Sequence, residues 1–306
     1  MADGTNPDRR LATRAFGKLN LCLILGPLRE DGYHELVSAV LPLDLADTVT
    51  IEASTGDSDE VVCPGVEGDN LASKAIASWR SLSGWDGAPV RVTIKKRIPV
   101  AAGMGGGSAD AAAALRLVAA FAGREDDALL TEIAPTLGAD VPPLLHGGPT
   151  LVRGTGTEVL QLPTPQTAGY LILPSNAGLS TPVVFRQAGE MGLRRSQADL
   201  DLISGSLQAA AKDEGWGFPP ELLGVNDLGP AAAVLEPSVS EALREAREAG
   251  ADQAFVTGSG PTVIGYFHGN EGPMRAAAAA EALGGRVPGA IACTASPRSA
   301  TIEEVQ

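Results

Sequence analysis

A glycine-rich segment at residues 103–108, Gly-Met-Gly-Gly-Gly-Ser, is the part of the sequence best suited to hold an anion. Glycine adopts positive φ and lets backbone N–H groups converge on a ligand without obstruction from a Cβ. An alternating apolar pattern at 90–94 precedes the segment, and an alanine-rich stretch at 108–122 follows it. A strand and then a helix are expected, and the helix start would add unpaired N–H donors and the positive end of its dipole. We predict a phosphate-binding loop, with Ser108 either capping the helix or contributing a hydroxyl.

The segment differs from two common phosphate-binding motifs. A Walker A loop needs a Lys after its last glycine, and the dinucleotide fingerprint needs a glycine where Ser108 stands. A flexible linker or a tight turn is the simplest alternative. However, the residues at 108–122 predict a helix that is apolar on nearly all faces and therefore buried. A linker is not expected to run directly into such a helix, so we favour phosphate binding.

Three polar side chains elsewhere could take part in proton or phosphoryl transfer. Lys18 and Asn20 alternate with Leu19 and Leu21, and alternate residues of a strand lie on one face. The pattern predicts a polar pocket, although a solvent-facing strand explains it equally well. Asp140 follows a helical pattern, and such a residue taken alone is more typical of a solvated turn.

Periodicity and capping residues predict some of the elements that position these groups. Apolar residues at helical spacing predict a helix over 71–82, with Asp69 or Asn70 as its N-cap and Gly84 beyond its end. Ser238–Glu241 resembles a capping box and predicts a second helix start in the C-terminal half.

The chain length and the mixture of elements predict two domains. A chain of 306 residues is long enough for about two. Strand and helix patterns occur in both halves, which indicates an α+β fold with mixed or antiparallel sheets. The turn-rich stretch at 161–169 is the best candidate boundary, so we expect domains at 1–165 and 166–306. The glycine turn Thr257–Thr262 lies between two apolar segments and predicts a hairpin.

The charge balance excludes several classes of protein. The chain has 23 Lys and Arg against 37 Asp and Glu, a net charge of −14. Such acidity does not suit general binding to nucleic acid or to a membrane surface. No apolar run approaches the ~18–20 residues of a membrane span, and no signal peptide is evident, so we expect a soluble cytoplasmic protein. Lys95, Lys96 and Arg97 nevertheless run into the glycine segment and predict a locally positive anion site.

Cysteine and histidine offer no metal or disulfide pattern. Cys22, Cys63 and Cys293 are odd in number and far apart, which predicts buried free thiols. The three histidines stand singly, without the spacing of a zinc site, so we predict no metal site built from protein side chains.

Taken together, these features resemble the GHMP kinase superfamily. Three motifs have its order: Lys18 in the first strand, the glycine segment within Pro99–Ala112, and the turn at Thr257–Thr262. The resemblance covers residues 14 to about 267 and is strongest to members that act on a cytidine diphosphate-linked methylerythritol. The motifs that suggest this group are Gly17–Leu21, Arg29–Glu35, Gly105–Ala112, Leu137–Pro142 and Asn226–Leu228.

The resemblance implies a two-domain α+β kinase that uses ATP and Mg²⁺, with its site in a cleft between the domains. Asp140 is then expected to be the catalytic base, with Lys18 as its partner. Of the residues implied at the substrate, Asn20 would lie near the methylerythritol, Tyr33 and His34 would recognise the cytosine, and Phe185 would stack on it. The residues implied at ATP are Asn70, Lys96, Pro99, Gly103, Gly105, Gly106, Gly107, Ser108 and Asp110.

Two other functions stay open from the sequence: another GHMP kinase, similar to homoserine or mevalonate kinase, and a catalytically silent nucleotide-binding protein. The chain also departs from the superfamily pattern at three places. Phe16–Gly17 replace Pro-Ala, Ala101–Ala102 replace glycines, and Gly229 replaces a Glu. None of these changes removes Lys18 or Asp140. The sequence is compatible with a monomer or a homodimer.

Overall fold

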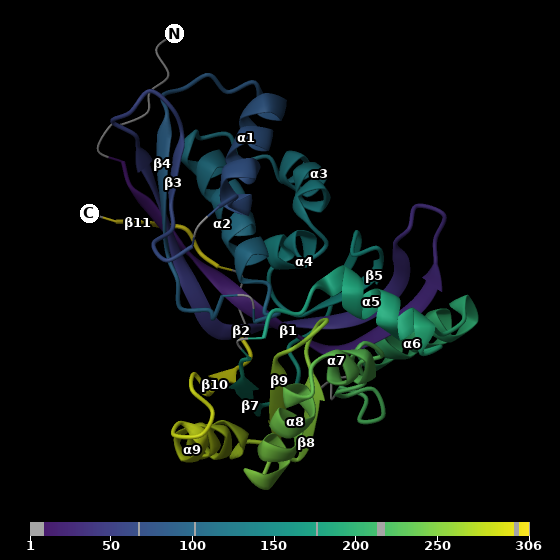
Figure 1. The fold of residues 1–306 in the computed structure, drawn as a ribbon. Helices are drawn as coiled ribbons and strands as arrows, with labels where there is room; N and C mark the ends of the chain where they lie inside the picture. Colours follow the sequence, from purple (N-terminus) through teal and green to yellow (C-terminus); the bar gives the residue numbers. More distant parts are fainter. Residues whose placement is uncertain are drawn as a thin grey trace.

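Two long antiparallel strands, β1 (Leu11–Leu28) and β2 (His34–Ala53), run from one side of the molecule to the other (Figure 1). Gly26–Pro27 are typical turn residues, yet the strand continues through them to Leu28. The chain then reverses before His34, where β2 begins. The computed structural model describes residues 9–66, 68–100, 102–175, 177–212, 218–296 and 300–305, so Ala101 lies outside the described residues.

Within the described residues, seven strands form the first sheet. Its order is β11-β1-β2-β4-β3, while β5 pairs with the other end of β2 and with β6. The β3–β4 pair is parallel and the remaining pairs are antiparallel, so the sheet is mixed, as predicted. The further strands are β3 (Glu60–Val62), β4 (Val90–Lys95), β5 (Thr150–Gly154), β6 (Glu158–Gln161) and β11 (Glu303–Glu304).

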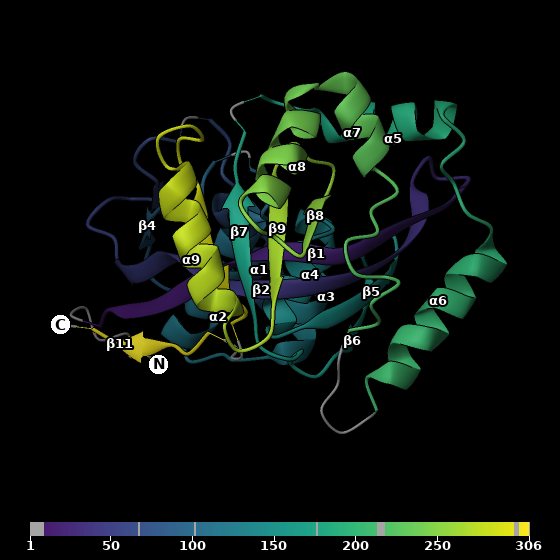
Figure 2. The same cartoon turned by 90° about the horizontal axis from the view of Figure 1, so that it is seen from below.

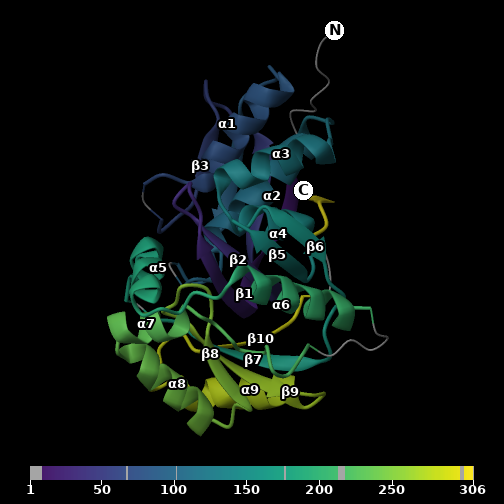
Figure 3. The same cartoon turned by 90° about the vertical axis from the view of Figure 1, so that its right-hand side faces the viewer.

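Helices cover one face of this sheet (Figures 1 and 3). The first of them has the caps that the sequence predicts. Asn70 Oδ1 accepts a hydrogen bond from the Ala72 N–H at 2.9 Å, and Gly84 ends the helix in the left-handed conformation, with φ +64°. The helices of this layer are α1 (Leu71–Ser83), α2 (Gly106–Phe121), α3 (Asp127–Leu137) and α4 (Val141–His146).

The alanine-rich helix α2 is buried on nearly all sides, as its composition predicts. It starts at Gly106, two residues earlier than expected. Gly105 is its N-cap, with φ +66° and no side-chain hydrogen bond to the first turn. Capping by Ser108 is therefore wrong, because Ser108 already lies within that turn. Despite its apolar character, neither α2 nor any other described helix is long and apolar enough to cross a membrane.

A second sheet of four described strands, in the order β10-β7-β9-β8, is antiparallel throughout. α8 and α9 cover its outer face (Figure 2), while its inner face shares a core with β1 that includes Leu19, Leu21, Tyr170 and Ile264. β8 and β9 flank Thr257–Thr262, so the predicted hairpin is confirmed. These elements are β7 (Ala168–Leu173), β8 (Gln253–Val256), β9 (Val263–His268), β10 (Ile291–Thr294), α8 (Ser238–Glu248) and α9 (Gly272–Leu283).

The remaining three helices, α5 to α7, lie toward the end of the β1–β2 pair at which the two strands are joined (Figures 1 and 2). α6 packs against both strands, and α5 packs against α7. The turn-rich stretch at 161–169 joins the two sheets, yet Ala295 bridges to Leu43 and β11 pairs with β1, so the C-terminal residues return to the first sheet. The division at 165 and 166 stays a prediction. The three helices are α5 (Thr181–Glu190), α6 (Gln197–Ala210) and α7 (Gly229–Leu235).

Two local predictions are wrong. The capping box does not form, because Ser238 is the first residue of α8 and Pro237 is its N-cap, without a side-chain cap. Glu236 Oε1 accepts from the Ser238 N–H instead, at 3.2 Å. Cys22 and Cys293 are buried free thiols, as expected, whereas Cys63 is only half-buried.

The tight packing of α2 predicts a large penalty for added volume. Ala114 is fully buried in the same core as Trp79, whereas Ala209 lies exposed on α6. Ala114→Leu should lower the free energy of unfolding by about 1–3 kcal/mol, because a close-packed core cannot take three more carbon atoms without strain. Ala209→Leu should stay within about 0.5 kcal/mol of the wild type. Urea unfolding followed by tryptophan fluorescence measures both, and equal stabilities would contradict this packing.

Candidate functional site

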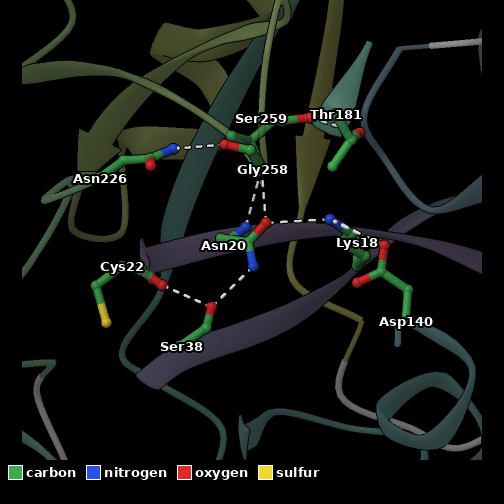
Figure 4. A network of polar contacts seen from close by, with 10 residues as sticks. Lys18, Asn20, Cys22, Ser38, Asp140, Thr181, Asn226, Gly258 and Ser259 are labelled. Carbon is green, nitrogen blue, oxygen red and sulfur yellow. Dashed lines mark hydrogen bonds and ion pairs between the residues drawn. The ribbon is translucent and has the colours of Figure 1, made fainter. Parts of the chain in front are cut away.

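The first strand carries a buried ammonium group. Lys18 and Asn20 are 3% and 5% exposed, so the solvent-facing alternative is wrong and the predicted polar pocket is confirmed. Lys18 Nζ donates a hydrogen bond to Asn20 Oδ1 at 3.1 Å and forms an ion pair with Asp140 Oδ2 at 3.4 Å (Figure 4). Asp140 lies at the start of α4, and its side chain is 40% exposed. A buried cation thus faces a carboxylate that an outside molecule can reach.

A bulge in β1 changes which residues reach this site. Asn20 pairs with Val40, but the register shifts before Cys22, and Leu23 then pairs with Ser38. Strict alternation predicts that Cys22 follows Lys18 and Asn20 on the polar face. The extra residue reverses this order, so Leu23 lines the cleft and Cys22 joins the core.

Asn20 belongs to a hydrogen-bonded network that ties the two sheets together (Figure 4). Its Nδ2 donates to Ser38 Oγ at 2.8 Å, and that hydroxyl donates to the Cys22 carbonyl at 2.7 Å. Its backbone N–H donates to Thr257 Oγ1 at 3.0 Å. Ser38 and Thr257 were not expected in the site. A serine inside the apolar run of β2 is a weak signal for Ser38, and only the three-dimensional structure reveals Thr257.

The second glycine turn packs directly over Lys18. A Cβ on Gly258 would lie 3.4 Å from the Gly103 carbonyl oxygen and 3.5 Å from Lys18 Nζ, and Gly258 has φ +58°. Asn226 Nδ2 holds this turn by donating to the carbonyls of Val256 and Gly258, both at 2.8 Å. The two glycine motifs, far apart in sequence, therefore meet backbone to backbone.

The glycine loop lines a cavity of about 340 Å³ at the N-terminus of α2. Gly105 is required there, because a Cβ would lie 3.0 Å from Lys18 Cγ. All of the residues that the resemblance implies at ATP line this cavity. They are Asn70, Lys96, Pro99, Gly103, Gly105, Gly106, Gly107, Ser108 and Asp110.

A second cavity of about 280 Å³ adjoins the first and shares Gly103, Gly105 and Ser108 with it. Lys18 and Asp140 lie in this second cavity. The loop that can hold a phosphate is thus the common wall of two compartments, and the ion pair stands beside that wall. This arrangement suits the transfer of a group from a molecule in one compartment to a molecule in the other. The other polar and aromatic residues that line the second cavity include Asn20, Ser38, Thr181, Phe185 and Ser259.

Lys96 is held by two carboxylates. Its Nζ lies 2.5 Å from Asp47 Oδ2 and 2.7 Å from Asp110 Oδ2. Asp47 is fully buried and also accepts the backbone N–H groups of Arg97 and Ile98, a role that the sequence did not reveal. Burial raises the pKa of Asp110 to about 6, with the ammonium of Lys96 acting in the opposite direction. The locally positive field expected from Lys96 is therefore cancelled.

The cytosine residues implied by the resemblance are only partly brought together. The rings of His34 and Phe185 lie 5.5 Å apart, and Phe185 lines the second cavity. His34 Nε2 is buried without a protein hydrogen-bond partner, and burial together with the charge of Arg194 lowers the pKa of His34. Tyr33, by contrast, is 68% exposed at the tip of the β1–β2 pair and does not line either cavity among the described residues.

Comparison with known proteins agrees with this geometry. The models of the GHMP kinases N terminal domain and the GHMP kinases C terminal domain match residues 70–148 and 219–289. A 4-diphosphocytidyl-2-C-methyl-D-erythritol kinase of Corynebacterium efficiens is 41% identical over 273 residues, which cover 83% of this chain and 84% of the relative. The chain belongs to the family of 4-diphosphocytidyl-2-C-methyl-D-erythritol kinases.

Further matches support this membership. The kinase of that name from Anaeromyxobacter sp. strain K is 38% identical, with 92% of this chain and 88% of the relative covered. A crystal structure of a 4-(cytidine 5'-diphospho)-2C-methyl-D-erythritol kinase matches with a TM-score of 0.73 at 32% identity, over 92% of this chain and 98% of that one. A homoserine kinase from Cytophaga hutchinsonii, at 18% identity and a TM-score of 0.60, covers 97% of this chain and 98% of its own and shares the fold alone. The predicted α+β GHMP kinase fold is confirmed.

The raised pKa of Asp110 should make stability depend on pH. The ordinary pKa of Asp is about 4, whereas that of folded Asp110 is about 6. Between these two pH values, Asp110 loses its proton in the unfolded chain but keeps it in the folded chain. The contribution of this group to stability therefore falls as pH rises through that window. Asp110→Asn lacks this titration, so the wild type should lose stability relative to the variant across it. Urea unfolding of both proteins over this range measures the difference, in which carboxyl groups distant from Asp110 cancel. A difference that does not change with pH would contradict the raised value.

Proposed function

We propose that this chain transfers the γ-phosphate of ATP to the 2-hydroxyl of 4-diphosphocytidyl-2-C-methyl-D-erythritol, giving ADP, the 2-phosphate and a proton. The observation that carries the proposal is the pair of cavities that share the glycine loop, with Lys18 and Asp140 beside it. The family supplies the identity of the substrate. The second cavity, called the acceptor cavity from here on, supports this substrate, because the cavity has a polar end near Lys18 and an aromatic end near Phe185.

The glycine loop would hold the phosphates of ATP. Its backbone N–H groups and the uncapped start of α2 provide donors and a positive dipole end for an anion. Asn70, Lys96 and Asp110 line the same cavity and would lie near the adenosine. Phosphoryl transfer depends mainly on positioning and on charge stabilisation, so a rigid cradle of this kind is the main requirement.

The residues present also fit a Mg²⁺ ion. The described residues contain no group of three or more His, Cys, Asp or Glu that could hold a metal. Mg²⁺ at a kinase site does not need such a cage, because phosphates and water provide most of its ligands. Ser108, which lines both cavities, is the residue that would hold it, and the ion would neutralise charge on the phosphate oxygens.

Asp140 would accept the proton of the attacking hydroxyl. Its carboxylate is accessible from the acceptor cavity, whereas its partner Lys18 is buried and fixed by Asn20. Lys18 would keep the carboxylate oriented and would stabilise negative charge that develops on the transferred group. The amide of Asn20 would lie beside the methylerythritol.

The aromatic end of the acceptor cavity would hold the cytosine. Phe185 lines the cavity and offers a ring face for stacking, and the ring of His34 lies 5.5 Å from it. Among the described residues His34 does not line the cavity itself, so its contact with cytosine stays a prediction. Recognition by Tyr33 stays a prediction, since its ring lies in solvent.

Substrate-dependent ADP formation tests the proposed function. Turnover should require the cytidine diphosphate alcohol, and neither mevalonate nor homoserine should support it. These two alcohols lack the cytosine that the His34 and Phe185 end would bind. Equal turnover of mevalonate or homoserine would favour another GHMP kinase activity, and ATP binding without turnover of any alcohol would indicate a silent nucleotide-binding protein.

Removing the proposed base should abolish most turnover. Asp140→Asn keeps the size of the side chain but cannot accept the proton, so kcat should fall by about 10²–10⁴-fold with little change in ATP binding. Asp126→Asn is a matched control, because Asp126 caps α3 outside the cleft and Asn caps helices equally well. Steady-state kinetics of both variants measure the effect. A kcat for Asp140→Asn within about threefold of the wild type would exclude its role as the base.

A further inference from the structure

A polar and an apolar side chain lie next to each other on the floor of the acceptor cavity. Asn20 of β1 pairs directly with Val40 of β2, and both line the cavity of about 280 Å³. Residues directly opposite each other in an antiparallel pair point to the same face, with Cβ atoms about 4.5–5.5 Å apart. The amide and the isopropyl group therefore stand side by side, two residue pairs along the strands from the pair that holds Lys18.

The polar member of this pair cannot turn away. The Asn20 side chain is fixed by Lys18 Nζ on its oxygen and by Ser38 Oγ on its nitrogen, and its backbone N–H is held by Thr257. Its position relative to the ammonium group is therefore set. A hydroxyl that approaches Asp140 must pass close to it.

The apolar member is equally rigid. Val40 is 3% exposed and lies in the middle of the sheet, paired with Asn20 on one side and with Thr150 of β5 on the other. Valine is branched at Cβ and has few accessible rotamers. A rigid apolar group offers dispersion contacts to an apolar substituent of the substrate, but it offers no hydrogen bond to water.

We propose that Val40 is a specificity-determining residue that recognises the methyl group on the carbon bearing the reacting hydroxyl. This inference rests on the proposed function. A tertiary alcohol of this kind presents a hydroxyl and a methyl group on the same carbon, as neighbours. The hydroxyl faces Lys18, Asn20 and Asp140, and the methyl group then faces Val40. A secondary alcohol in the same place leaves Val40 without a partner atom.

The test compares the natural substrate with its analogue that carries hydrogen in place of the 2-methyl group. The wild type should prefer the methylated substrate by about 10–100-fold in kcat/KM, the range that one apolar carbon provides in a fitted pocket. Val40→Ala should reduce this preference to less than about threefold, mainly through the methylated substrate. Val40→Thr keeps the shape and replaces one methyl group of the side chain with a hydroxyl, and it should reduce the preference in the same way.

Val152 supplies the matched control. It is also a valine, is also 3% exposed and lines the same cavity, but it pairs with Ser38, further along the strand from Lys18. Val152→Ala should change kcat/KM for both substrates by the same factor and so preserve the preference.

The outcomes separate this inference from the proposed function. Failure of the wild type to phosphorylate either alcohol would overturn the proposed function. Turnover of both alcohols with equal kcat/KM would leave that function standing and overturn the role of Val40. Equal loss of preference in Val40→Ala and Val152→Ala would also overturn the specific role of Val40, because the cavity as a whole would then recognise the methyl group. Circular dichroism of each variant shows that a kinetic loss does not come from unfolding.

Discussion

A buried ammonium group is the constraint on which the rest of the site depends. Lys18 is 3% exposed, and a cation taken out of water is costly unless acceptors replace its hydration. Asn20 Oδ1 at 3.1 Å and Asp140 Oδ2 at 3.4 Å are those acceptors. Asn20 is held in turn by Ser38 from the first sheet and Thr257 from the second. The two sheets therefore meet beside the buried ammonium group, and the second cavity is lined by that group and its partners.

Buried Lys18 and half-buried Lys96 have differently charged partners, and this decides which of them can bind an anion. Lys96 lies between Asp47 and Asp110, so the three side chains carry a net charge of −1 when both carboxylates are ionised. Lys18 faces one carboxylate and one neutral amide, so its group is not negative. Lys96 therefore adds no net positive charge beside the glycine loop. Backbone N–H groups at the start of α2 and the ammonium of Lys18 are better placed to attract an anion there.

The sequence predicts the parts of the site that depend on local chemistry. The cap at Asn70, the buried α2 and the glycine loop follow from residue type and short spacing, and the residues implied at ATP line one cavity. The sequence does not predict the features of the site that depend on how neighbouring strands pair. The bulge after Asn20 exchanges Cys22 for Leu23, and nothing in the apolar pattern marks it. Asp47, Ser38 and Thr257 were missed for the same reason, because each acts on a residue brought near only by strand pairing or by the meeting of the sheets.

The glycine loop at the start of α2 leaves N–H groups of the first turn without a side-chain acceptor, which does not favour the stability of the unliganded protein. Asn70, Asp126 and Ser196 each accept N–H groups in the first turn of α1, α3 or α6, but Gly105 offers no such side chain to α2. First-turn donors without acceptors are a cost that an anion can recover on binding. A Ser or Asp at position 105 would cap the helix in most proteins. Here its Cβ would lie 3.0 Å from Lys18 Cγ, in a left-handed conformation with φ +66°, and its oxygen would compete for the donors that a phosphate needs. The same glycine therefore leaves room for the buried ammonium and leaves the N–H groups of the helix start free to bind an anion.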